Sequence, residues 1–239
     1  MKIDTPKGLY KYKFIPIYVG IKKIDKIIAK ENLLLFKRIA DENSLRFGLC
    51  YGTMLGAIRE HDFIEHDEDI DLFILSEQRD VFLSMLFELR KYSFEVARYD
   101  RRGGLISIIR KGEYIDIYIF SPMKDDLREA LGDPMPEKYL KNLSLYEFQG
   151  ESFLGASDSI EMMQFFYGEN WSTPIVYADF DLPFYKKMIQ YIMWYTIYYM
   201  PDCLFYKVME ARKQKKIDRY EMRLERLKRI IGQKNILLL

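Results

Sequence analysis

The stretch Asp69-Ile70-Asp71-Leu72-Phe73-Ile74-Leu75 decides the fold that this sequence predicts. Side chains of a strand alternate between its two faces, so Asp69 and Asp71 share one face while the aliphatic residues that alternate with them point into a core. Two carboxylates about 6 Å apart repel each other by roughly 3 kcal/mol at an effective dielectric constant near 20, and a divalent cation removes that cost. The stretch therefore predicts a buried strand that begins with a metal site.

A phosphate site is expected just before this strand. Residues 46–51 form a short apolar run, and Gly52-Thr53-Met54-Leu55-Gly56-Ala57-Ile58-Arg59 follows with helical character. A glycine at such a junction lets the backbone approach a ligand closely, and the free amides of a helix start suit a phosphate. Helix capping by Thr53 is compatible with that role.

A third carboxylate lies in Tyr114-Ile115-Asp116-Ile117-Tyr118-Ile119-Phe120. The three isoleucines occupy one face of a strand with period two, and Asp116 lies in the middle of the other face. Asp116 is either an ordinary outward-facing residue or a partner of the Asp69 and Asp71 pair across the sheet.

In this order and spacing, three motifs resemble the LicD/fukutin family of phosphotransferases, which belong to the nucleotidyltransferase fold superfamily. They are the segments Tyr51-Gly52-Thr53-Met54-Leu55-Gly56-Ala57-Ile58-Arg59, Asp62-Phe63-Ile64 and Asp67-Glu68-Asp69-Ile70-Asp71. The stretch Phe166-Tyr167-Gly168-Glu169-Asn170-Trp171-Ser172-Thr173-Pro174 resembles the end of the family domain, so the likeness covers about residues 30 to 175. The chain departs from the family pattern at Glu65, His66 and Glu68, but it keeps the metal pair.

The resemblance implies an enzyme that moves a phospho-alcohol unit, such as phosphocholine or a polyol phosphate, from a CDP-activated donor. The acceptor would be a hydroxyl of a cell-surface glycan or glycolipid, as in the modification of lipopolysaccharide, capsule or teichoic acid. Asp69 and Asp71 would hold Mg²⁺, with Mn²⁺ as an alternative, and Asp116 would hold a second metal or accept the proton of the acceptor. No nucleic-acid partner is expected.

The resemblance also suggests which residues bind the donor. Gly52 and Thr53 would cradle its phosphates. Arg59 would clamp a phosphate, although a structural ion pair is the alternative. Asp67 is a substrate-site residue or a loop charge.

For other polar residues, a surface loop or turn position is the alternative to a binding role. Arg101 and Arg102 either grip a diphosphate or are exposed turn charges. His61 and His66 are read as polar loop residues because no third ligand at metal spacing joins them. An EF-hand is excluded, since Leu72 stands where its loop needs glycine and Gln78 where it needs glutamate.

Three other functions compete with the phosphotransferase. A nucleotidyltransferase of the same superfamily would attach the nucleoside monophosphate itself to a small hydroxylated acceptor. A glycosyltransferase with an Asp-x-Asp motif usually has about 100 residues of nucleotide-binding structure before it, whereas 68 residues precede Asp69 here. A non-catalytic scaffold is disfavoured because all three carboxylates are present.

The composition fits one catalytic domain with an extension. The 239 residues carry a formal net charge of +1, but residues 207–239 contain eleven Lys/Arg and four Asp/Glu, which gives +7 there and −6 for residues 1–206. Only two cysteines occur, which argues against a disulfide framework or a zinc cluster, and no secretory signal is visible, so a cytoplasmic protein is expected.

The expected fold class is α/β (α+β), a nucleotidyltransferase-like mixed β-sheet with helices packed on it and a helical C-terminal extension. The domains are an irregular segment at 1–20, a catalytic domain at 21–180 and the extension at 181–239. Within the domain we expect helices at 21–43 and from the N-cap Ser76 to 89, strands at 94–99 and 105–110, a polar connection at 121–142, a hairpin at 143–153 and a helix at 159–167.

The extension joins an aromatic segment at 184–200 to a basic helix at 204–231, separated by Pro201. Its apolar part is too short to span a bilayer, which needs about 20 residues. The aromatic segment, including the part near Tyr195, is read first as core. Peripheral contact with the inner face of a membrane is the alternative, and the basic helix is otherwise a solvated face or a contact with a second subunit.

Overall fold

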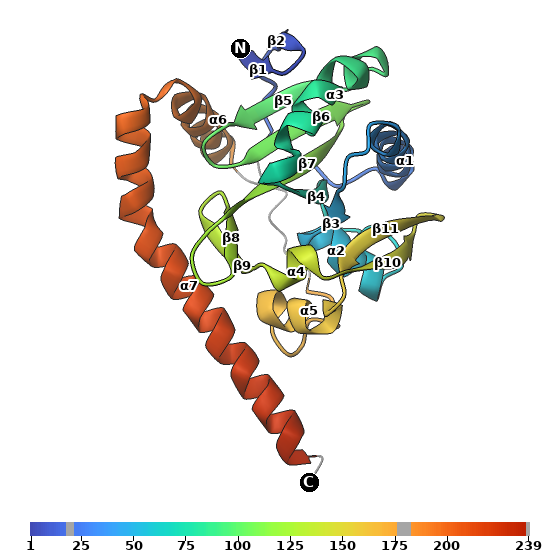
Figure 1. Ribbon diagram of the computed structural model, residues 1–239, viewed down its shortest axis with the longest axis vertical. Coiled ribbons are helices and arrows are strands. Elements are labelled where there is room, and N and C mark those ends of the chain that lie inside the picture. The colour runs from blue at the N-terminus through green and yellow to red at the C-terminus, as the bar shows by residue number, and fades with distance from the viewer. Residues whose placement is uncertain (18–21, 176–182, 238–239) are drawn as a thin grey trace.

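A mixed β-sheet forms the centre of the computed structural model, which describes residues 1–17, 22–175 and 183–237 (Figure 1). The sheet has seven strands, with the order β3-β4-β7-β6-β5 and an extension in which β7 pairs with β8 and β8 with β9. Among the described strands of this sheet, only β4 and β7 pair in parallel. The strands are β3 (Gly48–Leu49), β4 (Ile70–Leu75), β5 (Glu95–Asp100), β6 (Leu105–Arg110), β7 (Glu113–Pro122), β8 (Leu127–Ala130) and β9 (Asp133–Pro136). The predicted fold class is confirmed.

The strand register aligns four polar residues across the sheet. Asp71 of β4 is the register partner of Asp116 in β7, Asp116 is the partner of Ser107 in β6, and Ser107 is the partner of Arg98 in β5. Register partners lie side by side on one face of a sheet, so these four side chains form a continuous line. We call Asp71, Asp116, Ser107 and Arg98 the polar row.

The isoleucines that alternate with the polar row build the core on the opposite face. Ile70, Ile106, Ile115 and Ile117 have no exposed surface. They belong to one core cluster with apolar side chains of two helices that contact each other, α1 (Lys26–Glu42) and α3 (Arg79–Lys91). One face of the sheet is therefore sealed, and the other carries the charges.

Most of the expected elements are present with shifted ends. The first helix begins at Lys26 rather than at residue 21 because the Asp25 carboxylate accepts hydrogen bonds from the amides of Ile27 and Ile28 and so caps the helix. Ser76 was expected to be an N-cap, and this is wrong, since it opens the 3₁₀ turn η1 (Ser76–Gln78) and makes no capping bond. Elements near their predicted places are α2 (Tyr51–Arg59), β10 (Leu143–Phe148), β11 (Glu151–Ala156) and α5 (Ser159–Tyr167).

Two hairpins lie where irregular chain was expected. Residues 1–17 include β1 (Lys2–Thr5) and β2 (Gly8–Lys11), and the polar connection contains β8, β9 and the short helix α4 (Lys138–Lys141). Pro134 and Pro136 concealed β9, but this strand pairs only with β8 and therefore tolerates prolines as an edge strand.

The C-terminal extension consists of α6 (Phe184–Tyr199) and the long helix α7 (Asp202–Leu237), which runs down one side of the molecule in Figure 1. α7 contacts β9 and α5, and its Phe205, Leu227 and Ile230 are buried, so it is not merely a solvated face. The reading of the aromatic segment as core is wrong for most of α6, where Phe184 is 78% and Ile189 60% exposed.

No helix in the described parts of the chain is both long and apolar enough to cross a membrane. The domain boundaries at 20/21 and 180/181 lie in segments outside the described residues.

Candidate active site

A cavity of about 570 Å³ opens beside the first residue of the polar row. α2, the loop before β4, the segment that follows α5, and α7 line it together. We call it the carboxylate cavity; its polar lining includes Arg59, His66, Asp67, Asp71, Asn170 and Arg226.

Backbone and hydroxyl groups at the start of α2 hold Asp71 in place. The Asp71 amide donates to the Thr53 hydroxyl over 2.8 Å, and the Gly52 amide donates to Asp71 Oδ2 over 2.9 Å. Thr53 is 2% exposed and does not line the cavity, so in this arrangement it positions Asp71 from beneath. Gly52 lines the cavity, as its predicted role requires.

Gly52 also makes room for two converging carboxylates. A Cβ atom at this position would lie 2.4 Å from Asp67 Oδ2 and 3.3 Å from Asp71 Oδ2. The first distance is shorter than any real Cβ contact, so only glycine fits between α2 and the acidic loop without displacing Asp67. Asp67 therefore belongs to the same cluster as Asp71.

Burial raises the pKa values of the carboxylates in the acidic cluster, which comprises Asp67, Asp69 and Asp71, and repulsion between carboxylates adds to the effect at Asp69 and Asp71. Burial raises the pKa of Asp69 well above its usual value, and the charges of Asp71 and Asp116 raise it further. Burial and the charges of Asp67 and Asp116 do the same to the pKa of Asp71, while burial raises the pKa of Asp67 to about 6. Such a cluster favours a bound cation, because the cation replaces the repulsion with attraction.

Asp116 has partners of its own. Its Oδ2 accepts from Arg98 Nη2 at 2.7 Å, and its Oδ1 accepts from the Ser107 hydroxyl. Both partners come from the polar row. Asp116 is therefore oriented by neighbouring strands, and its charge is balanced by Arg98.

Of the predicted metal pair, Asp71 lines the carboxylate cavity and Asp69 does not, although the charge of Asp71 acts on Asp69. Within residues 1–17, 22–175 and 183–237, no three His, Cys, Asp or Glu side chains are grouped as ligands of one ion, and the predicted set of Asp69, Asp71 and Asp116 is not assembled as such. Carboxylate oxygens are the ligands that Mg²⁺ prefers, and Mg²⁺ is commonly held by one or two of them together with substrate phosphates. The pair suits that mode of binding.

Two arginines border the same cavity. Arg59 donates from Nη1 to the Trp171 carbonyl at 3.2 Å and pairs with Glu60 at 2.9 Å. Arg226 of α7 donates from Nη2 to the carbonyl of Phe165 at 2.7 Å, while its buried Nε has no hydrogen-bond partner among the described residues. Burial, followed by the charge of Arg223, lowers the pKa of Arg226. An anion in the cavity would satisfy this guanidinium.

Arg226 was not identified from the sequence, and Arg101 and Arg102 lie elsewhere. Arg226 is one of many basic residues in its helix, and nothing local marks it as the one that reaches the cavity when α7 packs on α5. Arg101 and Arg102 line a different cavity, and both pair with Asp202 of α7.

The comparison with protein families identifies the domain. Residues 44–154, which include α2, β4 and the Asp116 strand, match the model of the LicD/FKTN/FKRP nucleotidyltransferase domain. The chain therefore contains a LicD/FKTN/FKRP nucleotidyltransferase domain over residues 44–154.

Two curated relatives are uncharacterized proteins of Rickettsia. The chain is 24% identical over 180 residues to one from Rickettsia typhi (71% of this chain, 57% of the relative). It is 26% identical over 179 residues to one from Rickettsia prowazekii (68% of this chain, 65% of the relative). The chain thus spans less than two thirds of the length of either relative.

Similar solved structures include an antibiotic-resistance factor and an antibiotic adenylyltransferase. The antibiotic-resistance factor ANT(2'')-Ia in solution has a TM-score of 0.45 and 18% identity, with 82% of this chain and 95% of that chain covered. The lincomycin-bound lincosamide antibiotic adenylyltransferase LnuA has a TM-score of 0.42 and 10% identity, with 70% and 96% covered.

The acidic cluster predicts a stability change on substitution. Groups whose pKa is raised by folding stabilise the native state when protonated and lose this contribution as the pH rises through the folded pKa, so the cation-free cluster destabilises the protein at pH 7. Asp71→Asn should raise the melting temperature at pH 7 in EDTA and reduce the further stabilisation by Mg²⁺, as measured by thermal denaturation. Asp41→Asn on the surface of α1 is the control. An equal response of wild type and Asp71→Asn to Mg²⁺ would contradict the assignment.

Proposed function

We propose that the protein is a metal-dependent phosphotransferase that moves a phospho-alcohol unit from a CDP-activated donor to a hydroxyl of a cell-surface glycan or glycolipid. The unit would be phosphocholine or a polyol phosphate. One observation carries the proposal: carboxylates for a cation and arginines for phosphates border the same aromatic cavity, within a LicD-family domain.

The parts of a CDP-alcohol match the lining of this cavity. Asp67 and Asp71 converge at Gly52, and Arg59 and Arg226 supply guanidinium groups suited to phosphate oxygens. Phe166, Tyr167 and Trp171 offer aromatic surface on which a cytosine base can stack.

The proposed chemistry uses Asp69 and Asp71 as the holders of Mg²⁺ or Mn²⁺. Such an ion neutralises charge on the transferring phosphoryl group and on the departing CMP. Arg59 and Arg226 orient the diphosphate, and Gly52 lets it approach the backbone of α2. Thr53 acts indirectly by fixing Asp71.

Asp116 is proposed to receive the proton of the acceptor hydroxyl. An ionised carboxylate has about four lone-pair sites, and Arg98 and Ser107 occupy two of them. Arg98 and Ser107 orient the carboxylate, and its remaining lone-pair sites can accept the proton of the hydroxyl. A role for Asp116 in binding a second metal would require it to share its oxygens with Arg98, so the base role is preferred.

The nucleotidyltransferase alternative uses the same cavity and differs in the products. A phosphotransferase releases CMP from a CDP-alcohol and leaves the alcohol phosphate on the acceptor, whereas a nucleotidyltransferase leaves the nucleoside monophosphate there. Product mass separates the two reactions. A glycosyltransferase would transfer the sugar of a nucleotide sugar and should be inactive on CDP-alcohols.

The activity prediction concerns Asp69 and Asp71. With Mg²⁺ and a panel of CDP-alcohols, wild type should release CMP, and Asp69→Asn or Asp71→Asn should lower turnover at least about 100-fold because a principal charge-stabilising group is lost. Folding is checked by circular dichroism, and Asp41→Asn is the matched surface control. A folded Asp71→Asn variant with nearly wild-type turnover would refute the mechanism.

A second prediction compares two arginines of α7. Arg226→Gln should weaken binding of CDP by about tenfold or more, on the scale of one charge-assisted contact of about 1.5–3 kcal/mol. Arg229 lies on the same helix, is 77% exposed and pairs only loosely with Glu225, so Arg229→Gln should leave CDP binding unchanged. Calorimetric titration measures both. Equal affinities for the two variants would remove Arg226 from the donor site.

We also propose that α6 attaches the protein to the surface of an anionic membrane, where a lipid-linked acceptor would lie. Its large exposed side chains include Phe184, Tyr185, Ile189, Ile192 and Tyr199. A groove continues this surface past Pro201 to Leu204. Aromatic side chains favour the headgroup region, and the net charge of +7 over residues 207–239 complements anionic lipids.

Sedimentation with vesicles tests this attachment. The intact protein should sediment with anionic but not with neutral vesicles, and high salt should release it. Ile189→Asp together with Ile192→Asp should abolish sedimentation, whereas Met222→Asp on the exposed side of α7 should not. Failure of the intact protein to bind anionic vesicles at low salt would contradict the proposal.

A further inference from the structure

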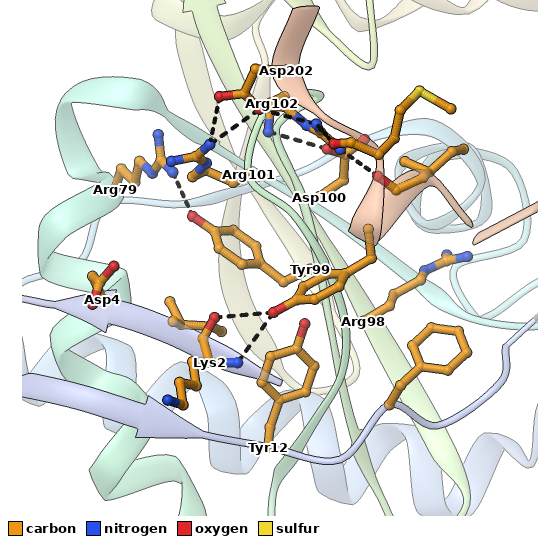
Figure 2. A pocket seen from close by; sticks show the side chains of 15 residues that line it. Lys2, Asp4, Tyr12, Arg79, Arg98, Tyr99, Asp100, Arg101, Arg102 and Asp202 are labelled. Carbon is orange, nitrogen blue, oxygen red and sulfur yellow. Dashed lines mark hydrogen bonds and ion pairs between the residues drawn. The ribbon is translucent and has the colours of Figure 1, made fainter. Parts of the chain in front are cut away.

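A second cavity, of about 370 Å³, lies at the other end of the polar row. The β1–β2 hairpin and the segment after it, the start of α3, the β5–β6 turn and the α6–α7 junction enclose it (Figure 2). We call it the arginine cavity. It shares no lining residue with the carboxylate cavity.

The lining of the arginine cavity is positive. It includes five basic residues and three acidic ones, so its formal charge is 5 − 3 = +2. The basic residues are Lys2, Arg79, Arg98, Arg101 and Arg102, and the acidic ones are Asp4, Asp100 and Asp202. A concave site with an excess of arginines attracts anions, and its low-dielectric walls strengthen that attraction.

Some of these charged side chains form hydrogen bonds and ion pairs that stabilise the fold. Arg102 is 8% exposed, donates to the Met200 carbonyl at 2.7 Å and pairs with Asp202 at 3.1 Å, so it fastens the α6–α7 junction to the β5–β6 turn. Asp100 accepts from the amides of Arg102 and Gly103 within that turn. These groups shape the cavity.

Arg79 and Arg101 make fewer or weaker ion pairs with the protein. Arg79 donates to the Tyr99 hydroxyl and forms no ion pair with any carboxylate in the described ranges. Arg101 has a side chain that is 63% exposed and reaches Asp202 only at 3.3 Å. Figure 2 shows both guanidinium groups on the same side of the cavity, near the Tyr99 hydroxyl. Two neighbouring cations of this kind can share one oxyanion.

A buried hydroxyl also lacks a well-formed hydrogen bond. Tyr12 is 6% exposed, and its hydroxyl oxygen has no hydrogen bond of normal geometry among the described residues, although it lies close to the Tyr198 hydroxyl. In Figure 2 this hydroxyl points into the cavity. An unsatisfied buried hydroxyl costs about 1–3 kcal/mol, so a ligand oxygen in the cavity would recover that cost.

We propose that the arginine cavity binds a phosphate monoester of a small hydroxylated molecule, at a site separate from the donor site. Arg79 and Arg101 contact the phosphate, and the Tyr12 hydroxyl donates to an oxygen of the ligand. The volume exceeds what a bare ion needs and falls in the range of small-molecule pockets, about 300–1,000 Å³. The rings of Phe14, Tyr99 and Tyr198 supply apolar walls for the carbon skeleton.

The site extends the proposed function without depending on it. Arg98 lines the arginine cavity and also donates to Asp116 at 2.7 Å, so the ligand would lie one side chain away from the third carboxylate. Binding at the arginine cavity is measured directly, however, and needs no turnover. A failure of the CDP-alcohol reaction would leave it unaffected.

Isothermal titration with glucose 1-phosphate, glucose and inorganic phosphate tests the proposal. Glucose 1-phosphate should bind saturably, inorganic phosphate more weakly, and glucose not measurably. Arg79→Gln and Arg101→Gln should each weaken glucose 1-phosphate binding at least about tenfold, and Arg79→Lys should retain more affinity than Arg79→Gln because it keeps the charge. Tyr12→Phe, which removes only a hydroxyl, should weaken binding severalfold.

Two controls separate the cavities. Arg38→Gln, an exposed arginine of α1, should not change the affinity for glucose 1-phosphate. Arg79→Gln should leave the affinity for CDP unchanged, and thermal unfolding checks that the variant is folded. Absence of saturable glucose 1-phosphate binding, equal binding by wild type and both glutamine variants, or loss of binding in Asp71→Asn would each overturn the proposal.

Discussion

The parallel pairing of β4 with β7 is the constraint on which the site depends. Its register places Asp71 beside Asp116, and the antiparallel register of β7 with β6 and of β6 with β5 continues the line to Ser107 and Arg98. A slip of one residue would turn the carboxylates into the core and the isoleucines toward the cavity. The buried isoleucines therefore stabilise the sheet and fix the register that aligns the charges.

The acidic end of the row is held by groups that do not themselves carry charge. Thr53 accepts from the Asp71 amide, and the Gly52 amide donates to the Asp71 carboxylate. The missing side chain of Gly52 leaves the space into which Asp67 points. The start of α2 thus concentrates negative charge, while Arg59 and Arg226 place positive charge on the same cavity. This separation of charge suits a cation bound to a polyphosphate.

The sequence predicted those parts of the fold and site that depend on local periodicity. Alternation revealed β4 and β7, and α5 lies at residues 159–167 as expected. β4 begins at Ile70, so Asp69 lies just before the strand. Short hairpins such as β1–β2 were missed because four-residue strands leave little pattern. The position of Arg226 in the carboxylate cavity and of Arg101 and Arg102 in the arginine cavity depends on how α7 and the α6–α7 junction pack, and tertiary contacts of this kind leave no local signal.

Binding of Mn²⁺ in place of Mg²⁺ tests the central claim most directly, because its electron paramagnetic resonance signal reports the bound ion without any assumption about the acceptor. With CDP present, wild type should bind Mn²⁺, whereas folded Asp69→Asn and Asp71→Asn variants should bind it at least about tenfold more weakly, and Asp41→Asn should match wild type. Mn²⁺ affinity in the presence of CDP that is the same for wild type and Asp71→Asn would contradict the account.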